Sequence, residues 1–224
     1  MTFRKSMATA VAVLAACAGL TGAHAQEVYL GAGLFGAQLG YAHSVNSSVN
    51  LRADYMTLGT RNKTSTESGT TYQSKLDLSR TALLADWFPF EGSTFRLTAG
   101  ATFNDMAFDL NAGGAGTTVD INGKSYALGA NDKLNIQVKM PRTTPYLGIG
   151  WGHKPAGKGW GFHADVGAII GSFKVSETRS GALVNGGALG VTQADMDKEL
   201  QDVRDSVAKL KVLPQLTLGV AYRF

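Results

Sequence analysis

Apolar and polar residues alternate one by one along most of this chain, which is the pattern of β-strands with one apolar face. In the segment 95–103, FRLTAGATF, apolar residues hold every second position and polar or small residues hold the positions between them. The same period recurs in eight segments, at about 28–34, 37–43, 49–55, 80–87, 95–104, 144–151, 160–170 and 216–224. The pattern therefore predicts an all-β chain.

The connections between these segments are of two lengths. Short ones lie at about 44–48, 89–93 and 152–159, and long ones at about 61–71, 111–135 and 177–211. Soluble sandwiches also show alternation, but short turns at one end and long loops at the other are typical of transmembrane β-barrels. Dividing 28–43 into a tight hairpin gives an even strand count, which places both chain ends on the periplasmic side. The sequence predicts an eight-stranded antiparallel transmembrane β-barrel.

One segment before the last strand has helical periodicity instead. Thr192 is suited to cap a helix, with Asp195 three residues later. Apolar residues then recur at helical spacing, at Met196, Leu200, Val203, Val207 and Leu210. We expect an amphipathic helix over about 193–210. Its apolar stripe is expected to pack on the barrel rim or the membrane surface, with a partner-binding helix or a lid over the barrel as alternatives.

The first 25 residues have the features of a secretory signal peptide. Arg4 and Lys5 precede a short apolar run at 7–20, and Ala23-His24-Ala25 is a small-x-small cleavage site. We expect cleavage after Ala25, which leaves residues 26–224 as an exported barrel domain. The only cysteine, Cys17, lies in a lipobox-like LAAC, but we favour a disposable residue of the apolar run over a lipidated terminus.

The charge balance argues against nucleic acid as a partner. The whole chain has 21 basic and 17 acidic residues, and cleavage removes Arg4 and Lys5, which leaves 19 basic residues against 17 acidic ones. After Leu20 no apolar run is long enough for a membrane helix. Since only helices and closed barrels satisfy every backbone group in lipid, a barrel is the expected form, and the bacterial outer membrane is the expected location.

Aromatic residues gather beside the short turns. We expect an aromatic girdle at one membrane interface, formed by Trp87, Phe88, Phe95, Trp151, Trp160, Phe162 and Tyr222. The chain ends on an alternating strand whose apolar face comprises Leu218, Val220, Tyr222 and Phe224.

Charged residues recur at the positions that face inward. These are Arg52, Asp54, Arg80, Asp86, Arg96, Arg142, His163, Asp165 and Arg223. The interior of an eight-stranded barrel is just wide enough for side chains to fill it, and buried charges require partners. We therefore expect a polar network that fills the barrel, with a narrow ion path along the same groups as the alternative.

The sequence offers little support for an enzyme. His43-Ser44 is expected at a periplasmic turn, and His163 and Asp165 share a strand face with no nucleophile placed beside them. No group of His, Cys or carboxylates has metal-ligand spacing, so we expect no metal and no cofactor. The stretch 31–36 matches the dinucleotide fingerprint G-x-G-x-x-G, but no helix follows it, and a barrel hairpin explains its glycines better.

Five stretches together resemble a widespread family of proteobacterial outer-membrane proteins with an OmpA-like eight-stranded barrel: RTALLADWFPF, FRLTAGATFND, TPYLGIGWG, GWGFHADVGAIIGS and LPQLTLGVAYRF. The resemblance implies the fold and the location, and it implies that the closing Phe224 is read by the outer-membrane insertion machinery. The expected partners are outer-membrane lipids and lipopolysaccharide, and the expected state is a monomer. The expected function is a structural or surface-interaction role in the envelope. A porin-like channel for ions or small solutes is the main alternative, and a lipid A-modifying enzyme is a weaker one.

Overall fold

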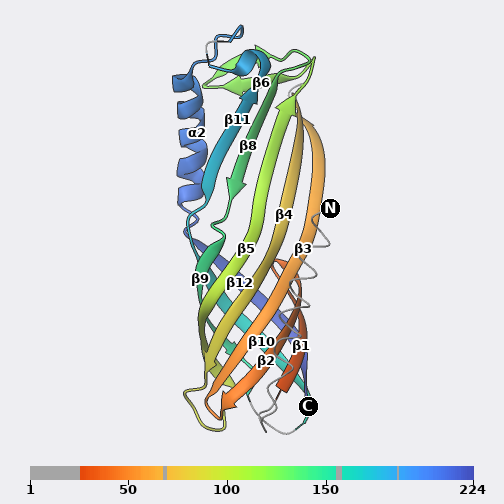
Figure 1. Cartoon of the computed structure of the whole chain (residues 1–224), viewed down its shortest axis with the longest axis vertical. Coiled ribbons are helices and arrows are strands. Elements are labelled where there is room, and N and C mark those ends of the chain that lie inside the picture. Colours follow the sequence, from red (N-terminus) through yellow and green to blue (C-terminus); the bar gives the residue numbers. More distant parts are fainter. Residues whose placement is uncertain (1–25, 68–69, 155–157, 186) are drawn as a thin grey trace.

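The computed structural model describes residues 26–67, 70–154, 158–185 and 187–224. Its strands are β1 (Gln26–Gly33), β2 (Gly36–Asn46), β3 (Val49–Glu67), β4 (Thr70–Trp87), β5 (Phe95–Gly113), β6 (Thr118–Ile121), β7 (Lys124–Ala127), β8 (Lys133–Lys139), β9 (Thr143–Trp151), β10 (Gly159–Ile170), β11 (Lys174–Ser180) and β12 (Val212–Arg223). A 3-10 turn, η1 (Gly181–Leu183), and the helix α2 (Gln193–Ala208) lie between β11 and β12 (Figure 1).

Eight of these strands close into a ring. Its order is β1-β2-β3-β4-β5-β9-β10-β12, and β12 pairs antiparallel with β1 from Glu27↔Arg223 to Gly33↔Thr217. The first hairpin is as tight as expected, since Gly33 pairs with Gly36. The prediction of an eight-stranded antiparallel barrel with one helix before the last strand is therefore confirmed. We call the end where Gln26 and Phe224 lie the terminal rim.

At the opposite end the wall continues as a partial sheet rather than as loops. Long strands β3, β4 and β5 run beyond the ring, β8 pairs with the far half of β5, and β11 pairs with β8. Figure 1 shows this sheet rising past the ends of β1, β2 and β12. The segments 61–71 and 111–135, which we expected to be long loops, are thus largely strands. The sequence did not reveal these strands because they are polar there, which obscures the alternation. We call this sheet, together with β6, β7, η1 and α2, the lobe.

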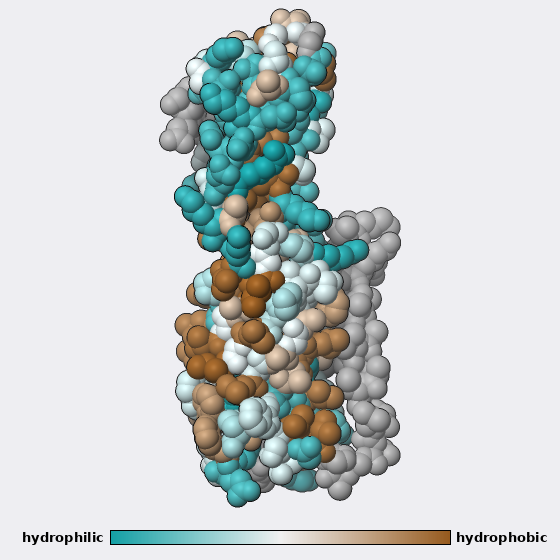
Figure 2. Space-filling model, turned by 90° about the vertical axis from the view of Figure 1, so that its left-hand side faces the viewer, coloured by the Kyte–Doolittle hydropathy of each residue, from teal (hydrophilic) through white to brown (hydrophobic). Residues whose placement is uncertain are grey.

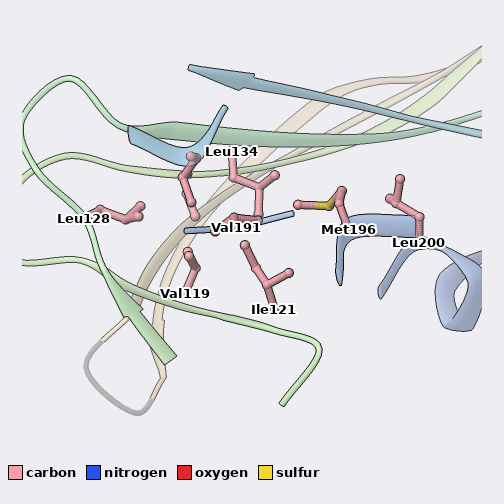
Figure 3. Packing of buried hydrophobic residues seen from close by; sticks show 9 residues of the cluster. Val119, Ile121, Leu128, Leu134, Val191, Met196 and Leu200 are labelled. Carbon is pink, nitrogen blue, oxygen red and sulfur yellow. The ribbon is translucent and has the colours of Figure 1, made fainter. Parts of the chain in front are cut away.

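The lobe has an apolar core of its own. Its buried residues are Ala112, Val119, Ile121, Leu128, Leu134, Leu183, Val191, Met196 and Leu200, most of them labelled in Figure 3. Met196 and Leu200 enter this core from α2, whereas Leu210, past the helix end, is half exposed. The apolar stripe of the helix therefore packs into the lobe core, whereas the sequence led us to expect packing on the barrel rim or the membrane surface.

The outer surface divides into two zones. Large apolar side chains are exposed around the barrel wall, including Leu30, Leu83, Leu147, Phe162 and Leu218. Figure 2 shows the apolar surface gathered on the barrel and a mostly hydrophilic surface on the lobe. An outward apolar band on a closed barrel is the surface that lipid requires.

None of the helices in the described residues has the length and apolar character needed to cross a membrane.

Candidate functional site

The barrel interior is lined by charged side chains from most of the ring strands. Residues predicted to face inward and found buried are Arg52, Asp54, Arg80, Asp86, Arg96, His163 and Asp165, and Arg223 is half-buried at the terminal rim. Each comes from the inner face of its strand, because successive side chains of a strand point to opposite faces. The interior is the candidate functional site.

Four of these residues form a closed ring of opposite charges. Arg52 Nε lies 2.6 Å from Asp86 Oδ2, and Arg52 Nη2 lies 3.0 Å from Asp165 Oδ1. Arg96 completes the ring, with Nη2 2.6 Å from Asp165 Oδ1 and Nε 3.4 Å from Asp86 Oδ1. The hydroxyl of Thr98 also donates to Asp86 at 2.7 Å. Two cations and two anions cancel, which is the condition under which charges persist in a buried setting.

This ring of charges crosses the barrel. Arg52 comes from β3 and Asp165 from β10, which are separated by three strands on either side around the eight-stranded ring. If a water-filled pore passed through the barrel at this level, the side chains that line it would be exposed to solvent. Instead Arg52 is 3%, Asp86 1% and Arg96 0% exposed. The interior is therefore filled at this level by the side chains themselves.

Further ion pairs lie on either side of this ring. Arg80 Nη1 lies 3.2 Å from Asp54 Oδ1, and the Tyr29 hydroxyl donates to Asp54 at 3.3 Å. At the terminal rim Arg223 pairs with Glu27, whose other carboxylate oxygen contacts His153.

An apolar cluster lies on the lobe side of the ring of charges. Its buried members are Ala82, Leu84, Met106, Met140, Tyr146 and Ile169, with Phe35, Leu78, Phe173 and Leu213 packed against them. Phe35 belongs to the β1–β2 turn and Phe173 to the link between β10 and β11, so the cluster lies where the barrel meets the lobe. The interior is thus charged toward the terminal rim and mixed toward the lobe, where buried Arg80, Thr102 and Asn104 lie beside the apolar cluster.

Large interior side chains lie over glycines of neighbouring strands. A Cβ at Gly40 would collide with the Tyr29 ring, and one at Gly167 would collide with the Tyr146 hydroxyl. The missing side chains provide the space that these bulky residues occupy. Such close approaches allow a narrow barrel to enclose aromatic and arginine side chains.

Two histidines and a carboxylate meet near the terminal rim. His153 from the β9–β10 turn lies beside His163 of β10, with ring centroids 4.6 Å apart, and both rings pack on Tyr29. His163 Nδ1 lies 3.5 Å from Asp165 Oδ2. One ligand atom each from His153, His163 and Asp165 fall within 4.8 Å of one another, and all three residues are buried. Sequence spacing did not reveal this group, because His153 reaches it from a turn.

Two predicted site residues are placed elsewhere. Arg142 is exposed, because it lies in the irregular link before β9, where strand alternation does not apply. Phe88 is buried instead of joining a lipid-facing girdle, since it continues the inward side of Asp86 past the end of β4. Its backbone N–H bonds to the carbonyl of Ser48 at 2.9 Å, so the side chain fills the rim from within.

The other aromatic residues of the predicted girdle lie at the outer surface of the terminal rim. Trp87, Trp151, Trp160, Phe162 and Tyr222 are exposed, and Phe95 is half-buried with its ring 5.6 Å from that of Trp151. The Tyr222 ring lies 5.2 Å from Trp160 and 5.3 Å from the closing Phe224. Leu218 and Val220 share this exposed face.

The candidate catalytic features do not assemble. His43 and Ser44 are neighbours in β2 and point to opposite sides of the wall, so they cannot act as a base and its nucleophile. The glycines at 31–36 form the β1–β2 hairpin, and no helix opens there to receive a pyrophosphate.

Two carboxylates of the lobe hold chain segments together. Asp195 accepts hydrogen bonds from the Thr192 hydroxyl at 2.6 Å and from Asn122 Nδ2 at 2.9 Å. These bonds, with a third from the Thr192 backbone, hold the pKa of Asp195 well below its usual range. Asp132 accepts from the backbone of Ala182 and Gly129, which lowers the pKa of its carboxyl group.

Comparisons with known proteins support the fold. No family model matches the chain, and no curated protein matches it. The solved structure of Acinetobacter baumannii CarO2 is similar: it is 26% identical with a TM-score of 0.56, over 89% of this chain and 98% of that one. A. baumannii CarO is 24% identical with a TM-score of 0.51, over 88% of this chain and 97% of that one. The chain is an outer-membrane β-barrel protein like CarO.

A third similar structure is a major outer membrane protein from Thermus thermophilus. It is 16% identical over 91% of this chain and 100% of that one, with a TM-score of 0.44.

Proposed function

We propose that this protein is a non-enzymatic, monomeric outer-membrane barrel with a filled interior, which carries its lobe at the cell surface. The observation that supports this most directly is the Arg52–Asp165 ion pair, which spans the lumen between opposite strands. With the ring of charges on one side and the apolar cluster on the other, the barrel serves as an anchor for the lobe. Its role is structural or one of surface interaction.

The orientation follows from the asymmetry of the two ends. In the part of the chain that the structure describes, the terminal rim carries the short connections 47–48 and 88–94, while the opposite end carries the lobe. In outer-membrane barrels short turns face the periplasm and long connections face outward. The lobe is therefore the extracellular part, near lipopolysaccharide.

Conductance in planar bilayers tests the filled interior against its main rival, a small channel. We expect purified protein to give no steady single-channel steps. Reproducible steps that disappear when Arg52 or Arg96 is replaced by Gln would establish the channel instead. The matched control is Arg142→Gln, since Arg142 is exposed and outside the network.

Overproduction in cells tests the enzymatic alternative. The non-enzymatic role predicts unchanged lipid A mass spectra, compared with cells that carry the empty vector. New lipid A species that depend on the protein would contradict it.

We propose that the exposed face of β12 guides assembly, together with a signal peptide cleaved after Ala25. Leu218, Val220, Tyr222 and Phe224 form an apolar face that ends at the chain terminus. Deleting Phe224 should lower the amount of heat-modifiable barrel in the outer membrane and leave export to the periplasm intact. Substituting Leu210 by Ala, outside this face, should leave assembly unchanged. A normal amount of barrel in the deletion variant would refute this role.

A further inference from the structure

His153, His163 and Asp165 have an arrangement that ion pairing explains only in part. Among the residues that the structure describes, His153 Nε2 is buried without a hydrogen bond, and His163 Nδ1 has only the longer 3.5 Å contact with Asp165 Oδ2. A buried polar atom that lacks a partner is costly, and each such atom in a folded protein calls for an explanation. Both histidines belong to the group whose ligand atoms lie within 4.8 Å of one another.

The backbone of His153 is also unusual. Its φ is +58°, in the left-handed region that non-glycine residues seldom adopt. Asn50 Nδ2 donates to the His153 carbonyl from the other side of the rim, which holds the turn in this conformation. Strain that the surroundings maintain in this way is concentrated at functional sites.

The surroundings of the group match those of a metal site. Glu27 contacts His153 Nδ1, which leaves Nε2 as the nitrogen without a partner among the described residues, and a carboxylate in this position orients metal-bound histidines. Asp165 Oδ1 lies 2.6 and 3.0 Å from the two arginines, whereas Oδ2 accepts from Arg52 Nη1 at 3.5 Å, so Oδ2 is the more available oxygen. Imidazole and carboxylate ligands suit Zn²⁺ and similar divalent transition metals.

The dimensions are compatible with one ion. Atoms that lie 2.0–2.2 Å from a single Zn²⁺ are at most about 4.4 Å apart, so a slight closing of the group is sufficient. The position is close to the terminal rim, and His163, Gly152 and Gly219 also line an open groove of about 570 Å³ on the outer wall, beside the exposed Phe162 and Leu218. The wall is thin at this point, because Gly152 and Gly219 have no side chains.

The geometry points to a divalent transition-metal site formed by His153, His163 and Asp165, with Glu27 orienting His153. Three protein ligands leave a position for water. Arg52 and Arg96 compete with the ion for Asp165 and limit its affinity. The ion would join the β9–β10 turn to β10 and, through Glu27, to β1, so that it acts as a clip at the terminal rim.

Metal binding by the purified protein tests this proposal. The full chain is prepared without a histidine tag, freed of metal with a chelator, and titrated with Zn²⁺ in equilibrium dialysis. Wild-type protein should bind one Zn²⁺ per chain, show the visible absorption of four-coordinate Co²⁺ when Co²⁺ is used, and unfold at a higher temperature with metal. Absence of stoichiometric binding by the wild type would overturn the proposal.

Substitutions locate the ligands. H153Q and H163Q should each weaken Zn²⁺ binding by at least tenfold, and E27Q should weaken it by about 10- to 100-fold as an orienting residue. H43Q is the matched control, since His43 lies in β2 outside the group, and it should bind as the wild type does. Equal losses in H43Q and H163Q would refute the site.

Should H153Q or H163Q fail to fold, X-ray absorption of Zn²⁺ on the wild-type protein decides the question. Two imidazole ligands support the site, and none or one contradicts it.

Discussion

The barrel and the lobe fill their interiors with side chains of opposite character. Inside the barrel Arg52, Asp86, Arg96 and Asp165 neutralise one another, whereas inside the lobe Ile121, Leu183, Val191 and Met196 exclude polar groups. The solvent outside each region explains the difference. Lipid already receives the apolar side chains of the barrel wall, so that its interior is free to be polar. The lobe faces water, so its apolar residues must turn inward.

The stability of the two regions should therefore respond to different substitutions. The largest effect is expected for Arg52→Met, which leaves Asp86 and Asp165 with one arginine in place of two. Loss of one partner from a buried ion pair costs about 3–5 kcal/mol. Urea unfolding of the folded barrel in detergent, followed by its heat-modifiable migration, measures the change. Arg142→Met, at an exposed position, should stay within about 0.5 kcal/mol of the wild type. A comparable result for both variants would contradict a paired interior.

A second substitution affects the lobe alone. Met196→Ala removes a fully buried side chain from the lobe core and should lower the stability of the lobe by about 2–5 kcal/mol. Hydrogen exchange of residues 193–208 and 118–127, read by mass spectrometry, should rise, while the barrel keeps its heat-modifiable migration. Leu210→Ala, at a half-exposed position just beyond the same helix, should change neither. Loss of the folded barrel in Met196→Ala would show that the two regions fold as one unit.

The smallest effect on stability is expected when the pH is lowered. The pKa of Asp195 is lowered by its bonds to Thr192 and Asn122, so its carboxylate stabilises the folded lobe above the ordinary aspartate pKa of about 3.9. This contribution is lost as the pH falls below that value toward the pKa of the folded state. The protection factors of the lobe amides, which correct for the intrinsic pH dependence of exchange, should therefore fall as the pH is lowered from about 4 to about 3, and Asp195→Asn should reduce the difference. Asp202→Asn, exposed on the same helix, should keep it.

Alternation in the sequence was sufficient to predict the eight strands of the ring, because lipid favours apolar side chains on the outer face of each strand and the interior accepts polar ones on the inner face. It located Arg52, Asp86, Arg96 and Asp165 on inner faces for that reason. It failed for Arg142, which lies outside the regular strands. Phe88 was misplaced because aromatic residues beside the short turns were grouped into one girdle, although the alternation of β4, continued by two residues from Asp86, places Phe88 inside. Alternation did not predict the strands of the lobe either, since β6, β7 and β8 are short and polar and contain too few alternating apolar residues. Capping by Thr192 and Asp195 was readable because it depends only on local spacing.

The sequence could not predict which interior charges pair with each other, and the reason is geometric. Arg52 meets Asp165 only because β3 and β10 lie opposite each other once the ring closes. The approach of His153 to His163 depends likewise on the path of a turn, which no residue spacing encodes. Pairs that cross a closed barrel are set by its diameter and stagger.

The glycines beneath the large interior side chains have a consequence for how this protein changes over time. Tyr29 occupies the space that Gly40 leaves, and Tyr146 the space that Gly167 leaves, so the glycine of a pair cannot gain a side chain alone. A mutation that gives Gly40 a side chain is tolerated only in a descendant that has already shortened Tyr29. The order of change is therefore fixed, and relatives with a side chain at position 40 should have a residue smaller than tyrosine at position 29.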